Sequence, residues 1–108
     1  MIRARIDFES MELVIDGHAG GERNPEGHDL VCAAVSTLAY ALAATMEEQN
    51  RYGKLRELMH EEKEGYSYLR AAAKTEEWGQ VMARFETVVD GLRLVSEQYP
   101  ECLKLQFE

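Results

Sequence analysis

Residues 30–46 decide the fold, and they read LVCAAVSTLAYALAATM without a charged side chain. The run is shorter than the roughly 20 apolar residues that cross a bilayer, and it contains Ser36 and Thr37. We therefore interpret residues 30–49 as a helix that is buried on most sides of a small core. Asp29, just before the run, is a plausible N-cap of that helix.

The residues before this helix predict a hairpin and a loop. Apolar and charged residues alternate from Ile2 to Phe8, which is typical of a half-buried strand. A second apolar segment, residues 13–15, follows a short turn, so residues 2–17 are predicted to form a hairpin. Residues 17–27 are polar and rich in glycine, which is typical of a loop.

The residues after the helix predict two strands, a second helix and a last strand. Residues 54–62 and 65–73 have the pattern of strands, with a helix over residues 55–59 as the alternative for the first of them. Thr75 is a good N-cap for a helix that runs to about Gln98 and buries Trp78 on its apolar face. The last strand is indicated by apolar residues that alternate with polar ones: Leu103, Leu105 and Phe107.

The order of these elements is β-β-α-β-β-α-β. It predicts an α/β (α+β) fold in which one mixed sheet is covered by two helices, because both helices have an apolar face that needs a partner. The chain has 108 residues, the usual size of one domain, so we expect residues 1–108 to form a single domain. An exposed sheet edge or apolar patch would also support a dimer.

The net charge of −8 argues against nucleic acid as the main partner and favours a basic protein or peptide. The first 15 residues lack the unbroken apolar stretch of a secretory signal, and no membrane segment is expected. We therefore expect a cytoplasmic protein. In that reducing compartment Cys32 and Cys102 are expected to be thiols, with a bridge between them as the alternative.

Cys32 is the candidate nucleophile. It lies three residues after the expected cap, in the first turn of the helix, near backbone N–H groups that have no partner within the helix. Such groups stabilise a thiolate, and they also stabilise the oxyanion that forms when a thiolate attacks a carbonyl. His18 is the candidate base, because it follows the hairpin and opens the glycine-rich loop, on the rim of the sheet where the helix starts.

Each of these residues also has a structural interpretation. Cys32 would then be a small core residue of an alanine-rich helix, and His18 an exposed loop residue. Asp29 would be a cap rather than the acid of a triad. Ser36, one turn after Cys32, would either hydrogen-bond near the site or bond back to its own helix.

A zinc site is a third interpretation of the same region. Cys32, His18, His28 and Asp29 would supply its ligands, but their spacing matches no common ligand pattern. Elsewhere in the chain, His60 is expected to be exposed. The acidic residues 61–64, with one lysine among them, are expected to form a solvated turn rather than an acid–base pair.

Two boxes of sequence resemble a known family. Residues 17–20 read GHAG, and residues 27–36 read GHDLVCAAVS. This pairing resembles the ribosomal-processing cysteine protease family Prp, whose pattern is Gly-His-Ala-Gly, a short glycine-containing loop, and Gly-x-Asp-Ile/Val-Val-Cys-Ala-Ala-Val-Ser. The loop between the boxes is longer here, and Leu30 takes the place of the usual Ile or Val.

The resemblance implies a cysteine endopeptidase that removes the N-terminal extension of ribosomal protein bL27. It implies that Cys32 is the nucleophile and His18 the base, that Asp29 and Ser36 support the site, and that the protein is a homodimer that needs no cofactor. The residues that it implies for the substrate loop are Gly17, Ala19, Gly20 and Gly21. The alternative function is a non-enzymatic ribosome-associated binding module, with residues 17–27 as its recognition loop.

Overall fold

The computed structural model describes residues 1–18 and 28–108, except for the side chains of His28 and Asp29. The elements follow the predicted order, with a short 3-10 turn before the second helix. They are β1 (Ile2–Asp7), β2 (Glu12–Asp16), α1 (His28–Arg51), β3 (Leu55–Lys63), β4 (Tyr66–Ala73), the 3-10 turn η1 (Thr75–Glu77), α2 (Trp78–Gln98) and β5 (Leu103–Phe107).

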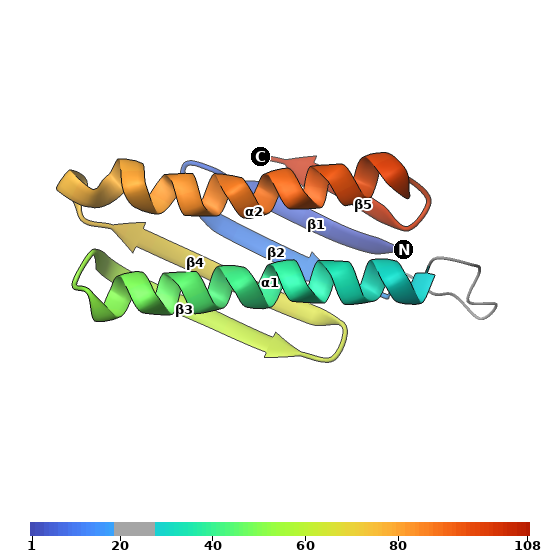
Figure 1. Ribbon diagram of the computed structural model, residues 1–108, viewed down its shortest axis with the longest axis horizontal. Coiled ribbons are helices and arrows are strands. Elements are labelled where there is room, and N and C mark those ends of the chain that lie inside the picture. Colours follow the sequence, from blue (N-terminus) through green and yellow to red (C-terminus); the bar gives the residue numbers. More distant parts are fainter. Residues whose placement is uncertain (19–27) are drawn as a thin grey trace.

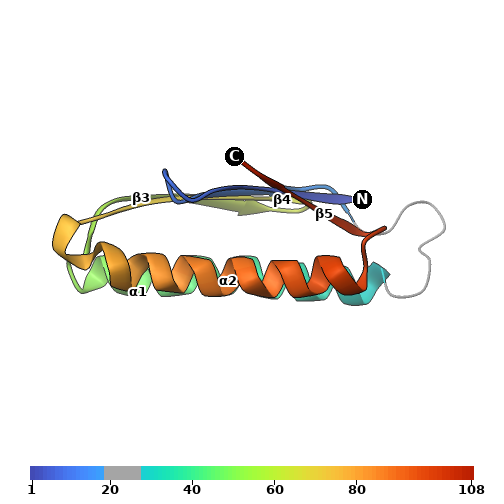
Figure 2. The same ribbon diagram turned by 90° about the horizontal axis from the view of Figure 1, so that it is seen from above.

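The strands form one layer, and the two helices form a second layer on one face of it (Figure 2). α1 and α2 lie side by side across the sheet (Figure 1). The described strands form a five-stranded sheet in the order β3-β4-β2-β1-β5. β1 pairs with β5 in parallel, whereas the other neighbours are antiparallel. The predicted α+β fold with one mixed sheet and two helices is therefore confirmed.

The alternation of apolar residues decides which face of the sheet the helices cover. Ile2, Ala4 and Ile6 of β1 are at most 3% exposed, whereas the charged residues between them are exposed. From α2, Phe85 is fully buried and lies edge-to-face with Phe8, with 5.9 Å between the ring centroids. Burying one such side chain contributes about 1.5–3 kcal/mol. The core between the two layers therefore holds the helices on this face.

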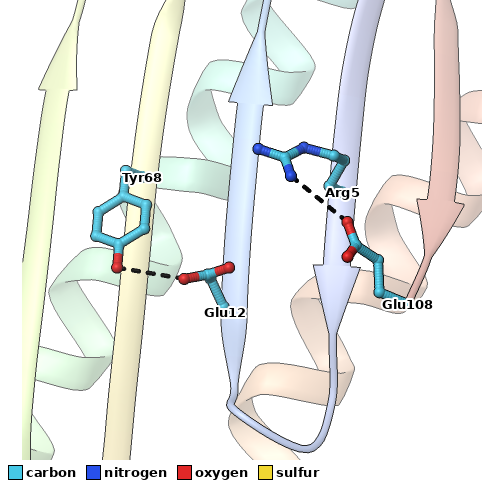
Figure 3. Close-up of polar contacts among 4 residues, drawn as sticks. All are labelled: Arg5, Glu12, Tyr68 and Glu108. Carbon is cyan, nitrogen blue, oxygen red and sulfur yellow. Dashed lines mark hydrogen bonds and ion pairs between the residues drawn. The ribbon is translucent and has the colours of Figure 1, made fainter.

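The opposite face of the sheet carries polar contacts between neighbouring strands. Figure 3 shows the Tyr68 hydroxyl of β4 donating to the Glu12 carboxylate of β2 over 3.3 Å, and Arg5 lying 3.5 Å from Glu108. Partial burial raises the pKa of Tyr68, and the nearby charge of Glu12 adds to that effect. The exposed Arg5–Glu108 pair contributes little to stability, because solvent screens it.

The starts of both helices differ from the prediction. α1 begins at His28, so Asp29 is its second residue rather than its N-cap, and Cys32 is its fifth residue. Thr75 begins the 3-10 turn instead of capping α2, whose N-cap position is Glu77. Trp78 is 52% exposed, so its predicted place on the buried face is wrong. A cap contributes only about 1 kcal/mol, so a residue that suits an N-cap does not by itself fix where a helix starts.

α1 is buried on one side only, which corrects the prediction that it is buried on most sides. By length and composition alone, its segment Leu30–Arg51 is apolar enough to span a membrane, with a mean hydropathy of 1.6. Only 33% of its most apolar stretch is buried in the protein. The core helix of a soluble protein passes the same test. The solvent side of α1 carries an apolar α1 face, made of Leu30, Ala33, Tyr40, Ala41 and Ala44, all of them exposed.

His60 ties α1 to β3, so its predicted exposure is also wrong. Its side chain is 26% exposed; Nε2 lies 2.7 Å from a Glu47 oxygen of α1, and Nδ1 lies 3.5 Å from a Glu62 oxygen. The hydrogen bond to Glu47 raises the pKa of His60 above 6.5, and the charges of Glu62 and Glu47 add to this, whereas partial burial opposes it. The folded protein therefore favours the imidazolium.

The stability contributed by His60 is expected to depend on pH. Because folding raises its pKa, the contribution is fully present below about pH 6.5 and is lost as the pH rises through the folded-state pKa. Glu47 is half exposed, so we expect about 1 kcal/mol or less. His60→Gln should lower the urea midpoint at pH 5.5 and change it much less at pH 9. An equal decrease at both pH values would contradict this prediction.

Candidate active site

Cys32 and His18 line the same cavity, which has a volume of about 500 Å³. The cavity is bounded by the end of β2, the N-terminal half of α1 and the turn between β3 and β4. Residues far apart in the sequence therefore share one space: a thiol from the helix and an imidazole from the segment after β2. A nucleophile and a base placed in this way have the components of nucleophilic catalysis.

Cys32 is half-buried on α1, where its side chain packs partly against the core and also reaches the cavity. Since α1 begins at His28, the N–H groups without a partner within the helix belong to residues 28–31, one turn before the thiol. Side chains on a helix tilt toward its N-terminus, so the sulfur lies over that first turn. The positive end of the helix dipole is thus near the sulfur, although Cys32 is not itself in the first turn.

The backbone around His18 is held from two sides. The nitrogen of Met1 donates to the His18 carbonyl over 2.7 Å, and the N–H of Gly17 donates to the Gly65 carbonyl over 2.9 Å. Gly17 has a φ of 100°, and a Cβ there would collide with the Met1 carbonyl, so only glycine fits at this position. The imidazole of His18 is exposed, but its attachment point is fixed by these neighbours.

The turn between β3 and β4 is the part of the site that sequence reasoning missed. With the strand ends beside it, this turn contributes Glu62, Lys63, Glu64, Gly65 and Tyr66 to the cavity wall. Lys63 and Glu64 are exposed, as the predicted solvated turn implies, but the prediction gave this segment no place in the site. Only the pairing of the strands could have indicated that this turn belongs to the site, because the turn contains no motif. β4 pairs antiparallel with β2, so the start of β4 lies beside the end of β2, where His18 follows.

The remaining predicted site residues fall into two groups. Ser36 lines the cavity one turn after Cys32 and is exposed, and Gly17 lines it from the end of β2. Three predicted loop residues lie outside the described part of the chain: Ala19, Gly20 and Gly21. The side chain of Asp29 also lies outside it. Tyr40, two turns after Cys32, also lines the cavity and was not predicted.

Both cysteines are thiols, which removes the alternative of a bridge between Cys32 and Cys102. Cys32 is half-buried at the cavity, whereas Cys102 is 2% exposed in the core. Within residues 1–18 and 28–108, as far as their side chains are described, there is no cluster of three histidine, cysteine or acidic residues that could hold a metal ion. The zinc interpretation thus gains no support from these side chains.

Solved structures of two other proteins are similar to this chain. A structure described as the essential ribosomal processing protease Prp from S. aureus, in complex with a substrate peptide, has a TM-score of 0.76 and 18% identity. The same protein with a covalently linked product peptide has a TM-score of 0.72 and 19% identity, and both comparisons cover all of both chains. SMU.848 from Streptococcus mutans has a TM-score of 0.69 and 25% identity over 99% of this chain and 93% of that chain.

A search of curated proteins finds no match. The family model described as cysteine protease Prp matches residues 1–104, which is nearly the whole chain and includes both sequence boxes and every wall of the cavity. The chain therefore belongs to the cysteine protease Prp family.

Proposed function

We propose that this cysteine protease removes the N-terminal extension of ribosomal protein bL27, with Cys32 as nucleophile and His18 as base. The observation that carries the proposal is that this thiol and this imidazole line one cavity in a chain of the Prp family. The comparison structures of the S. aureus protease, with its substrate and product peptides, support a ribosomal protein as the substrate.

The chemistry follows from the two side chains. His18 takes the proton of the Cys32 thiol, and the thiolate attacks the carbonyl carbon of the scissile peptide bond. The C–N bond breaks as the imidazolium returns the proton to the leaving amine, which leaves an acyl-enzyme on the sulfur. His18 then takes a proton from water, and the oxygen attacks the thioester carbonyl. The C–S bond breaks, the product leaves with a new carboxylate, and the Cys32 thiolate recovers the proton from the imidazolium. Ser36 and Asp29 would support the site from the same helix.

The charge around the cavity suits a basic substrate. Glu62 and Glu64 line it near the β3–β4 turn, together with Lys63, and the whole chain carries a net charge of −8. His60 lies 3.5 Å from Glu62 and offsets part of that negative charge. Ribosomal proteins that bind RNA are rich in lysine and arginine, because they neutralise phosphates. Attraction between opposite charges would raise the rate at which such a peptide meets the cavity.

The test is cleavage of a full-length bL27 that carries its natural N-terminal extension. Purified protein and substrate are incubated, and mass spectrometry locates the new N-terminus. We expect one cut between the extension and the mature protein, and little cleavage of a bL27 that lacks the extension. An intact extended bL27 after long incubation would overturn the substrate assignment, and it would favour the non-enzymatic binding module if the two proteins still associate.

We also propose that the protein is a cytoplasmic homodimer that uses the apolar α1 face. Leu30 and Tyr40 on this face are 62% and 58% exposed, and large apolar side chains that are exposed on one helix face suit a protein interface. Sedimentation equilibrium should give a mass of two chains, and Ala41→Arg should shift it to one chain. A single chain at all concentrations up to 100 micromolar (roughly the highest practical loading) would contradict the dimer.

A further inference from the structure

The β3–β4 turn lies directly against the imidazole of His18. An ideal Cβ built on Gly65 would be 2.7 Å from Nε2 of His18, 3.1 Å from Cε1 and 3.5 Å from Cδ2. Real Cβ atoms essentially never approach another heavy atom to under 3.0 Å. The ring therefore occupies the space that any side chain at position 65 would need.

The same turn is also bonded to the backbone that carries the imidazole. The Gly65 carbonyl accepts a hydrogen bond from the Gly17 N–H over 2.9 Å. On the other side, the His18 carbonyl accepts a hydrogen bond from the nitrogen of Met1, which directly precedes β1. These contacts fix the residue before His18 and the carbonyl of His18 itself. Gly65 is thus next to the histidine in two respects: its carbonyl bonds to the residue before His18, and the His18 ring lies where a Cβ of residue 65 would be.

We propose that Gly65 is a positioning residue for His18: it forms the wall that holds the imidazole in the cavity with Cys32. An exposed histidine after a strand has several rotamers available, and each would place the ring nitrogens differently. A wall on one side of the ring removes some of these rotamers. This inference rests on the proposed role of His18 as base, and it adds a residue from a part of the chain without a recognisable motif.

The chain offers a matched control for the substitution. Gly65 has a φ of 73° and Gly53 has a φ of 75°, so an L-residue is strained in the same way at both positions. A Cβ on Gly53, however, would meet only Lys74 Nζ at 4.0 Å, which is ordinary contact with a flexible side chain. The difference between Gly65→Ala and Gly53→Ala therefore isolates the collision with the imidazole from the cost of the left-handed backbone.

The experiment measures kcat and KM for an extended bL27 peptide in both variants, together with their melting temperatures. We expect similar decreases in Tm, but a loss of kcat of about 10- to 100-fold in Gly65→Ala only, because a displacement of about 1 Å in a reacting group has an effect of that size. KM should change little, because the ring orients a proton rather than the peptide. Equal kcat values in the two variants would overturn the proposal.

Two additions keep the outcome clear. Asparagine tolerates a positive φ better than alanine does, so Gly65→Asn and Gly53→Asn form a second pair in case Gly65→Ala fails to fold. The ring resonances of His18 in NMR spectra should move in the Gly65 variants and stay in place in the Gly53 variants. If they move while His18→Ala retains full activity, the base assignment fails and the contact stands; if they do not move, the positioning role itself is wrong.

Discussion

Replacing Cys32 with alanine is expected to abolish cleavage of the bL27 extension, with a loss of about 10⁴-fold or more. The proposed mechanism forms a covalent bond to this sulfur, and alanine offers no atom that can take its place. Folding should be nearly unaffected, because the half-buried side chain contributes only part of its surface to the core. The variant should still bind the extended substrate, and a pull-down or fluorescence titration would measure that affinity.

Cys102 provides the matched control for the loss of a thiol. It is 2% exposed in the core and lies outside the cavity, so Cys102→Ala should retain cleavage while losing some stability. Iodoacetamide should correspondingly modify Cys32 of the folded wild type and inactivate it, while Cys102 reacts only after unfolding. Equal cleavage by wild type and Cys32→Ala would remove the proposed mechanism altogether.

The fold could be predicted from the sequence because its elements have clear periods. Ile2, Ala4 and Ile6 alternate with charged residues, and this period places one face of β1 under the helices. The helical spacing of Val81, Phe85 and Leu92 likewise predicts the buried face of α2. Such patterns are local, so they do not depend on knowing which strands pair.

The part of the cavity wall formed by residues 62–67 could not be predicted, because its place depends on pairing between distant segments. Gly65 follows β3 and has no chemical group of its own, and its importance arises only when the register of β2 and β4 brings it to His18. The charged residues around His60 and Glu62 likewise predict exposed side chains, whereas both are half-buried in the structure. Only the position of α1 above β3 explains why Glu47 reaches His60. Nothing in the local sequence encodes that distance.

The helix starts failed for a different physical reason. Asp29 and Thr75 both have side chains that suit an N-cap, and in the structure one is the second residue of α1 while the other begins a 3-10 turn. Capping is worth only about 1 kcal/mol, so tertiary packing can shift a boundary by one turn without a large cost. The consequence for the site is that Cys32 is in the second turn of α1, where the dipole of the first turn still acts on its sulfur.

Replacing His18 with alanine is the second large loss that we expect, about 10²- to 10⁴-fold in kcat at neutral pH. In the proposed mechanism the imidazole acts twice: it takes the proton of Cys32, and it returns that proton to the leaving amine. The loss should be smaller than that of Cys32→Ala, because a small fraction of a thiol is ionised without help and still attacks.

His60→Ala is the control for the loss of an imidazole, because His60 bonds to Glu47 and Glu62 and lies outside the cavity wall. It should keep cleavage near the wild-type rate while lowering stability at acid pH. The deciding measurement is the rate at which iodoacetamide alkylates Cys32 at neutral pH, which should be lower in His18→Ala than in wild type. Equal rates in the two proteins would mean that the imidazole does not activate the thiol, even though both line one cavity.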